Sequence, residues 1–127
     1  MEQFGGLNRI YPEDKTLTEF DYRVYNTIYR GGKARRLFRR KRILSDGSIV
    51  AIRAWRVPKS FRTPEGVKYS LVYINTEGRR VLGYDNAEGK GHHRHEGEIE
   101  TPVDFKSIES HVESFLGELR EKWGVEL

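Results

Sequence analysis

The sequence predicts an α+β fold: an antiparallel meander sheet of about five strands, with one C-terminal amphipathic helix packed on a face. Two observations lead to this prediction. Between residues 17 and 84, runs of alternating apolar and polar residues are separated by Gly- or Pro-containing turns. Between residues 105 and 123, apolar residues recur at three- and four-residue steps, which is the spacing of a helix with one apolar side. Short turns join neighbouring strands into antiparallel pairs, and the helix can cover one face of the resulting sheet.

The length of 127 residues suits one domain with a single hydrophobic core. We expect residues 17–127 to form this domain. Residues 1–16 contain Gly5-Gly6 and Pro12 without sustained periodicity, so we expect them to form an N-terminal arm. The chain has no cysteine, which excludes disulfides, thiolate metal ligands and a cysteine nucleophile.

The strands are predicted from composition and turn residues. The run 17–28 fits a strand or a helical stripe, and its Tyr, Val, Thr and Ile content favours the strand. The run 33–45 predicts a second strand, which Asp46-Gly47 turns into a third at 49–57, where we expect Trp55 to be a core residue. A loop with two prolines leads to a fourth strand at 67–75, and a fifth follows at 79–84. The glycine-rich stretch 89–97 is predicted to be a loop.

The predicted helix is defined by its apolar residues, which are Phe105, Ile108, Val112, Phe115, Leu116, Leu119 and Trp123. Two starts are compatible with the sequence. Thr101 can be the N-cap with Pro102 in the first turn, or Asp104 can be the N-cap. Gly124 predicts the end of the helix.

The charge is distributed unevenly along the chain. Residues 1–60 contain 14 Lys/Arg and 6 Asp/Glu, whereas residues 61–127 contain 9 and 13. The first half therefore carries +8 and the second −4, which predicts a surface that attracts a polyanion.

Eight Lys/Arg lie between Arg30 and Arg42, and most of these eight belong to the second predicted strand. Because a strand alternates its faces, one group of cations should share a face and a second group should lie on the other. The first group is Arg35, Arg39 and Lys41, and the second is Arg36, Arg40 and Arg42. We expect these six residues to bind nucleic acid, with Arg53 or Arg56 of the next strand widening the surface. Alternatively, the charges protect an edge strand from aggregation.

Three of the four histidines lie between residues 84 and 95, in a segment that also carries acidic and basic residues. Imidazole titrates near neutrality, so a histidine pair suits RNA cleavage by the 2′-hydroxyl without a metal. We expect His93 and His95 to act as the acid-base pair, Lys90 and Arg94 to hold the phosphate, and Asp85 to orient one imidazole. In an extended segment His93 and His95 would share a side, opposite to Arg94.

Three other interpretations of this segment remain open. His92, His93 and His95, with Asp85, are competent metal ligands, although their spacing matches no familiar zinc pattern. The loop can instead bind phosphate without reacting, or Asp85 and Asn86 can simply form a turn. We expect a structural role for the isolated His111 and no cofactor.

Several short motifs of the chain resemble the TumE-type toxin family of prokaryotic toxin-antitoxin systems. They are Gly83-Tyr84-Asp85-Asn86, Gly89-Lys90-Gly91 and His93-Arg94-His95, preceded by Ser45-Asp46-Gly47-Ser48 and Lys68-Tyr69-Ser70 and followed by Glu100-Thr101-Pro102. The similarity covers about residues 35–123. It implies a growth-inhibiting toxin that a cognate antitoxin protein holds inactive. His92 departs from the family pattern, which has an acidic residue there.

Together, these features predict a cytoplasmic toxin that acts on RNA as a ribonuclease. We expect RNA and an antitoxin as partners. A homodimer can form if the acidic helix packs on the basic strand of a second copy. No apolar run approaches the roughly 20 residues of a membrane-spanning helix, so we expect no membrane partner.

Overall fold

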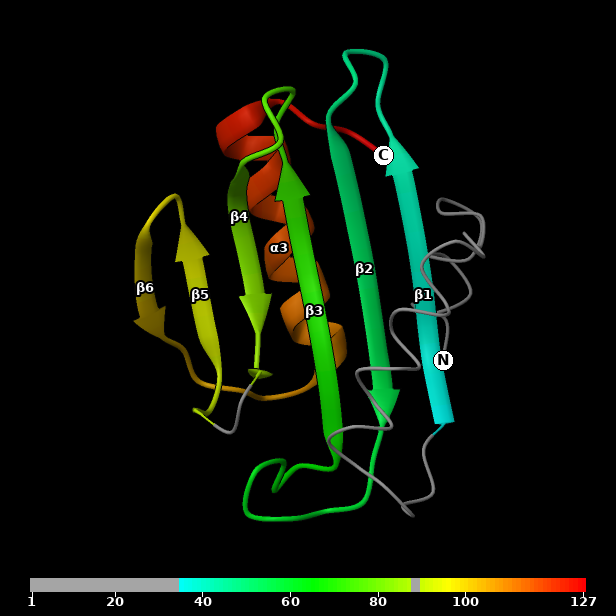
Figure 1. Ribbon diagram of the computed structural model, residues 1–127, viewed down its shortest axis with the longest axis vertical. Helices are drawn as coiled ribbons and strands as arrows, with labels where there is room; N and C mark the ends of the chain where they lie inside the picture. The colour runs from blue at the N-terminus through cyan, green and yellow to red at the C-terminus, as the bar shows by residue number, and fades with distance from the viewer. Residues whose placement is uncertain (1–34, 88–89) are drawn as a thin grey trace.

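The computed structural model describes residues 35–87 and 90–127, which form a sheet with one helix against it (Figure 1). The strands are β1 (Arg35–Ile43), β2 (Ile49–Arg56), β3 (Val67–Ile74), β4 (Arg80–Asp85), β5 (His93–Glu96) and β6 (Ile99–Pro102). The helix is α3 (Ile108–Trp123).

The six strands follow one another in the sheet in the order β1-β2-β3-β4-β5-β6, and every neighbouring pair is antiparallel. Helix α3 crosses one face of this sheet over β3 and β4 (Figure 1). The predicted α+β meander with a C-terminal helix is therefore confirmed. The expected strand within residues 17–28 and the arm at 1–16 lie outside the described residues.

The turn between β1 and β2 forms as its sequence predicts. Gly47 adopts a φ of 91°, a left-handed conformation that glycine accepts without a steric cost. The Asp46 carboxylate accepts hydrogen bonds from the hydroxyl and backbone N–H of Ser48, at 2.6 and 2.9 Å, and these bonds lower the pKa of Asp46. The turn thereby sets the register that pairs Ile43 with Ile49.

Two predictions for the segment 89–102 are wrong. The expected loop at 89–97 contains strand β5, and Thr101 and Pro102 belong to β6 rather than to the start of the helix. Each strand has only four residues, so the polar sequence shows little alternation, and pairing with β4 decides the conformation.

Helix α3 begins later than either predicted start. Ser107 is the N-cap, and its hydroxyl accepts a hydrogen bond of 3.0 Å from the backbone N–H of Ser110. The helix ends at Gly124, as predicted, where a left-handed φ of 65° lets the backbone N–H reach the carbonyls of Leu119 and Arg120.

The hydrophobic core lies between α3 and the sheet. Directly opposite residues of neighbouring strands share a face, and the row of Phe38, Ala54 and Tyr69 begins this apolar surface. The other buried apolar residues of the cluster are Val50, Ile52, Val67, Leu71, Tyr73, Leu82, Tyr84, Ile108, Val112, Phe115 and Leu119. We call this side of the sheet the helix face.

Strand β1 differs from simple alternation because its pairing with β2 is irregular. Arg36 pairs with Trp55 and Phe38 pairs with Ala54, so the residue between them is extra, as in a β-bulge. The bulge places Arg36 with Arg39 on the face opposite the helix, whereas the sequence predicted different faces for these two. Trp55 is half-buried on that same face and outside the core cluster, so its predicted core position is also wrong.

Candidate active site on the histidine face

The face of the sheet opposite α3 combines cations of the first strands with the histidines of β5, and we call it the histidine face. One row of directly paired residues crosses it from β1 to β5: Arg39, Arg53, Ser70, Asp85 and His93. The next row contains Lys41, Ala51, Val72, Gly83, His95 and Glu100. Residues far apart in the sequence therefore become neighbours on one surface.

Asp85, at the end of β4, lies at the centre of the candidate site. Its Oδ2 atom is 3.1 Å from Nε2 of His95, although the angle is not that of an aligned hydrogen bond. Its Oδ1 atom accepts a hydrogen bond of 3.2 Å from the backbone N–H of Ala87. Asp85 is thus held by the turn that follows β4 and can orient the imidazole of His95.

His95 is the more enclosed of the two candidate imidazoles. Its relative exposure is 7%, and its second ring nitrogen, Nδ1, lies 3.5 Å from Oε2 of Glu100 on β6. Both ring nitrogens of His95 therefore face carboxylates. This arrangement fixes the ring in place and leaves it little contact with solvent.

His93 is more accessible. It is half-buried, lies directly across from Asp85 in the β4–β5 pair, and has Pro102 on its other side. Within the described part of the chain, no ion pair or hydrogen bond engages its ring. The predicted arrangement of His93 and His95 on one side of the chain is confirmed, because both face away from α3.

Arg80 adds a cation that the sequence did not single out. Its Nη1 atom is 4.0 Å from Oδ2 of Asp85. Its side chain runs over Gly83, where a Cβ atom would approach Cδ of Arg80 to 3.0 Å. Glycine inside a strand often marks such a close approach, and this was the available signal. Glu100 was also missed, because β6 was not predicted.

Arg94 points the other way and belongs to the helix face. It lies between His93 and His95 in β5 and pairs with Tyr84. Its guanidinium binds both carboxylate oxygens of Glu118 on α3, with Nε at 3.1 Å from Oε2, and Nη2 also donates to Glu96 at 2.8 Å. These bonds raise the pKa of Arg94. Arg94 is therefore engaged in a link between β5 and α3.

Tyr84 completes this link by donating a hydrogen bond to Glu118. Burial of the phenol, followed by its bond to the carboxylate, raises the pKa of Tyr84 to about 12. Burial by itself would raise the pKa of Glu118, but the hydrogen bonds from Arg94 and Tyr84 outweigh it and lower the pKa. The three side chains form a charged network that also includes Glu96 and Lys122.

His92 is also separated from the two candidate imidazoles. Its ring stacks on Phe105, with centroids 4.4 Å apart. Its Nδ1 lies 2.8 Å from the hydroxyl of Tyr69 and its Nε2 lies 3.0 Å from Glu65. His92 therefore holds the aromatic cluster of the helix face, and it does not join His93 and His95 in a ligand set.

The cations of β1 are distributed over several environments. Arg35, Arg36 and Arg42 are exposed, Arg40 and Lys41 are half-buried, and Arg39 is fully buried. The guanidinium of Arg40 donates a hydrogen bond of 2.7 Å to the backbone carbonyl of Arg39. Lys90 is exposed after the β4 turn. The buried position of Arg39 separates it from the predicted surface.

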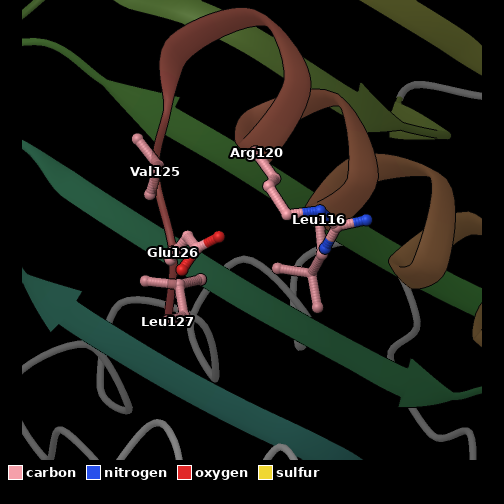
Figure 2. A pocket seen from close by; sticks show the side chains of 5 residues that line it. All are labelled: Leu116, Arg120, Val125, Glu126 and Leu127. Atoms are coloured by element: carbon pink, nitrogen blue, oxygen red, sulfur yellow. The ribbon is translucent and has the colours of Figure 1, made fainter.

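Among residues 35–87 and 90–127, no three His, Asp or Glu side chains are arranged to hold a metal ion. Two hollows of the described part lie away from these histidines. One of about 300 Å³ is lined by Leu116 and Arg120 of α3 and by Val125, Glu126 and Leu127 (Figure 2). A second of about 360 Å³ lies between the β1–β2 turn and the end of α3. Neither hollow includes a histidine.

No helix in the described part of the chain is long and apolar enough to cross a membrane.

The comparisons with known proteins gave one family. No curated protein and no solved structure matches the chain. The family model of Toxin TumE matches residues 13–123 and thus includes β1 to β6 and all of α3. The matched segment contains Asp85, His93 and His95, and it extends the similarity inferred from the short motifs towards the N-terminus. We conclude that this chain belongs to the TumE toxin family.

Proposed function

We propose that this toxin cleaves RNA without a metal, with His93 and His95 as the acid-base pair. The observation that supports this proposal is the position of both imidazoles and Asp85 on one face of the β4–β5 pair. One imidazole removes the proton of a 2′-hydroxyl, and the resulting 2′-oxygen attacks the adjacent phosphorus. The bond from phosphorus to the 5′-oxygen then breaks, and the second imidazole protonates that oxygen. The products are a 2′,3′-cyclic phosphate and a 5′-hydroxyl.

The spacing of the two histidines suits this reaction. Side chains two residues apart on one strand emerge about 7 Å apart. Two hydrogen bonds of about 2.8 Å with a phosphate between them fill a gap of this size. His93 is the half-buried ring that approaches the substrate first, and Asp85 orients His95.

The charge of the phosphorane-like transition state requires cations. Arg80 beside Asp85 and Arg53 in the row of His93 are candidates on the histidine face. Lys90 retains its proposed phosphate-binding role, whereas Arg94 does not, because Glu118 and Glu96 occupy its guanidinium.

Cations of β1 would extend the RNA-binding surface beyond the reacting phosphate. Arg36 and Lys41 lie on the histidine face, and Arg35 and Arg42 are exposed at the two ends of the strand. Such contacts position the backbone without reading bases. Among the earlier candidates, Arg40 lies on the helix face, because it pairs with the core residue Ile52, and we leave it out of this surface. Arg39 would support the surface from a buried position.

The central experiment incubates purified protein with end-labelled RNA and analyses the ends of the fragments. We expect cyclic phosphate or 3′-phosphate ends, no cleavage of 2′-O-methyl RNA, and loss of cleavage in both His93→Ala and His95→Ala. An excess of chelator should leave the rate unchanged. Cleavage that persists in both variants would remove these histidines from the mechanism, and cleavage that requires added divalent metal would favour a metal-dependent phosphodiesterase.

A second candidate function is RNA binding without cleavage. The carboxylates on both sides of His95, and its low exposure, favour this alternative, because they limit access to one of the two required rings. Binding that weakens steeply with salt, without fragments, would support it.

Family membership also leads us to propose a cognate antitoxin as partner, encoded by a neighbouring gene. Co-purification with the product of that gene, and protection of cells from growth inhibition, would test the proposal. Light scattering of the isolated protein would test the homodimer.

A further inference from the structure

Phe61, in the loop between β2 and β3, is an exposed aromatic residue without an assigned role. Its relative exposure is 88%. A phenyl ring this exposed adds nothing to the core, and its flat apolar surface is available to a binding partner. The other strongly exposed large apolar residues of the described part, Ile43 and Ile99, lie at strand ends on other parts of the sheet.

The exposure of Phe61 results from an ordered turn. Thr63, two residues later, is fully buried, and its hydroxyl donates a hydrogen bond of 3.3 Å to the carbonyl of Pro58. The hydroxyl of Ser60 accepts hydrogen bonds from the backbone N–H groups of Arg62 and Thr63, at 3.2 and 3.3 Å. The turn therefore holds Thr63 inward and presents the phenyl ring to solvent.

The loop of Phe61 lies at the same end of the sheet as the candidate site. In Figure 1 this loop runs beneath β3 towards the end of β4. Glu65 of the loop is 3.0 Å from Nε2 of His92, the residue immediately before His93. The loop is thus attached to the residue that precedes β5, and His93 is the next residue along the chain, with its ring on the opposite face.

The surroundings of Phe61 are basic and polar. The guanidinium carbon of Arg62 lies 5.7 Å from the centre of the phenyl ring, and Lys59 is exposed on the other side of Ser60. Apart from Pro58 and Pro64, the other exposed residues of the loop are polar or charged, so the loop offers a partner protein little further apolar surface. An aromatic ring flanked by cations instead suits a nucleotide, with the base on the ring and the phosphate near a cation.

We infer that Phe61 is a positioning residue that stacks on an unpaired base of the RNA strand bound at the histidine face. This inference rests on the proposed action on RNA. It adds a substrate class, single-stranded RNA, because a base within a duplex is not free to stack on a side chain. Arg62 holds a phosphate next to that base.

The test measures binding separately from cleavage. Fluorescence anisotropy of the full chain is recorded with a labelled 2′-O-methyl oligouridine, which cannot undergo attack by its 2′-oxygen. We expect Phe61→Ala to weaken binding at least about fivefold, which is the lower range for loss of one base stack, and Phe61→Tyr to retain binding. Ile99→Ala is the matched control, because it shortens another exposed apolar side chain, and it should bind like the wild type.

A second ligand distinguishes a base from a backbone contact. With an oligonucleotide of the same length that lacks bases, Phe61→Ala should bind as well as the wild type, whereas Arg62→Ala should still bind less. Equal affinity of wild type and Phe61→Ala for the oligouridine, or no binding by the wild type, would overturn the inference. So would loss of antitoxin binding in Phe61→Ala with unchanged RNA affinity.

Failure of the inference is distinguishable from failure of the proposed function. RNA cleavage with no effect of Phe61→Ala on binding would leave the function and remove the stacking role. The converse result, stacking without cleavage, would support a binding module in which Phe61 contacts an unpaired base.

Discussion

Three consecutive residues of β5 are divided between the two faces of the sheet, which use them for different purposes. Arg94 points to the helix face, where its guanidinium donates hydrogen bonds to Glu118 and Glu96. Tyr84 donates a hydrogen bond to the same carboxylate of Glu118. His93 and His95, on either side of it, point to the histidine face beside Asp85. The helix face is closed by packing, whereas His93 on the other face retains an unengaged ring among the described residues.

This difference shows how a strand separates stability from chemistry. Alternation places neighbours on opposite faces, so one short segment can contribute both to the attachment of α3 and to a candidate active site. Substitutions on the two faces should therefore separate: those on the helix face should lower the free energy of unfolding, and those on the histidine face should change activity. The following predictions are ordered by their effect on that free energy.

The largest loss is expected for Phe115→Ala. Phe115 is fully buried between α3 and the sheet, so its removal should lower the free energy of unfolding by about 3–5 kcal/mol. Phe61→Ala makes the same substitution at an exposed site and should alter the free energy of unfolding by less than about 0.5 kcal/mol. Urea denaturation of both variants measures the difference, and similar losses would show that α3 does not close the core.

His111 should make stability dependent on pH. Burial, and then the nearby His92, lower the pKa of His111 to about 4 from its ordinary value of 6.5. The unfolded chain therefore takes up a proton that the native state excludes, and stability should fall as the pH decreases from 6.5 to 4. His111→Leu should remove about 1–3 kcal/mol of this decrease. An unchanged pH profile in urea denaturation would contradict the prediction.

Arg94→Ala should destabilise the attachment of β5 to α3. It leaves the half-buried carboxylate of Glu118 without its guanidinium, at an expected cost of about 1–2 kcal/mol. RNA cleavage per folded molecule should persist, since Arg94 lies on the helix face. Loss of cleavage at an unchanged free energy of unfolding would instead return Arg94 to the phosphate site.

Glu118→Gln should make the free energy of unfolding less dependent on pH, in a more acidic pH range than His111 does. The pKa of Glu118 in the folded protein is lowered, so its contribution is present above the ordinary value of 4.5 and is lost as the pH falls through the folded value. We expect an effect on the order of 1 kcal/mol, because the group is partly exposed. Urea denaturation at several pH values between 5 and 3 gives the free energy of unfolding of wild type and variant. An equal decrease of this free energy in both proteins would contradict the prediction.

The smallest effect on stability is expected for His93→Ala. Its ring makes no hydrogen bond or ion pair with the described residues, so the free energy of unfolding should change by less than about 1 kcal/mol. Cleavage should nevertheless fall by about 100- to 10,000-fold if His93 is an acid or base. A large loss of stability would make His93 a structural residue and weaken the comparison of the two faces.

The elements that could be predicted from the sequence are those whose signals are local. The Asp46-Gly47 turn, the alternation in β3 and the apolar stripe that ends at Gly124 each depend on residues close in the chain, and all three were predicted. The shared side of His93 and His95 also followed from alternation.

The contacts between side chains of distant segments could not be predicted from the sequence and are known only from the fold. Pairing with β4 makes β5 a strand despite its polar sequence, and α3 supplies the carboxylate that engages Arg94. The bulge in β1 and the path of Arg80 over Gly83 likewise depend on neighbouring strands. Periodicity describes the direction of a side chain from its own strand, whereas its partner comes from a distant segment, and that information exists only when the segments pack together.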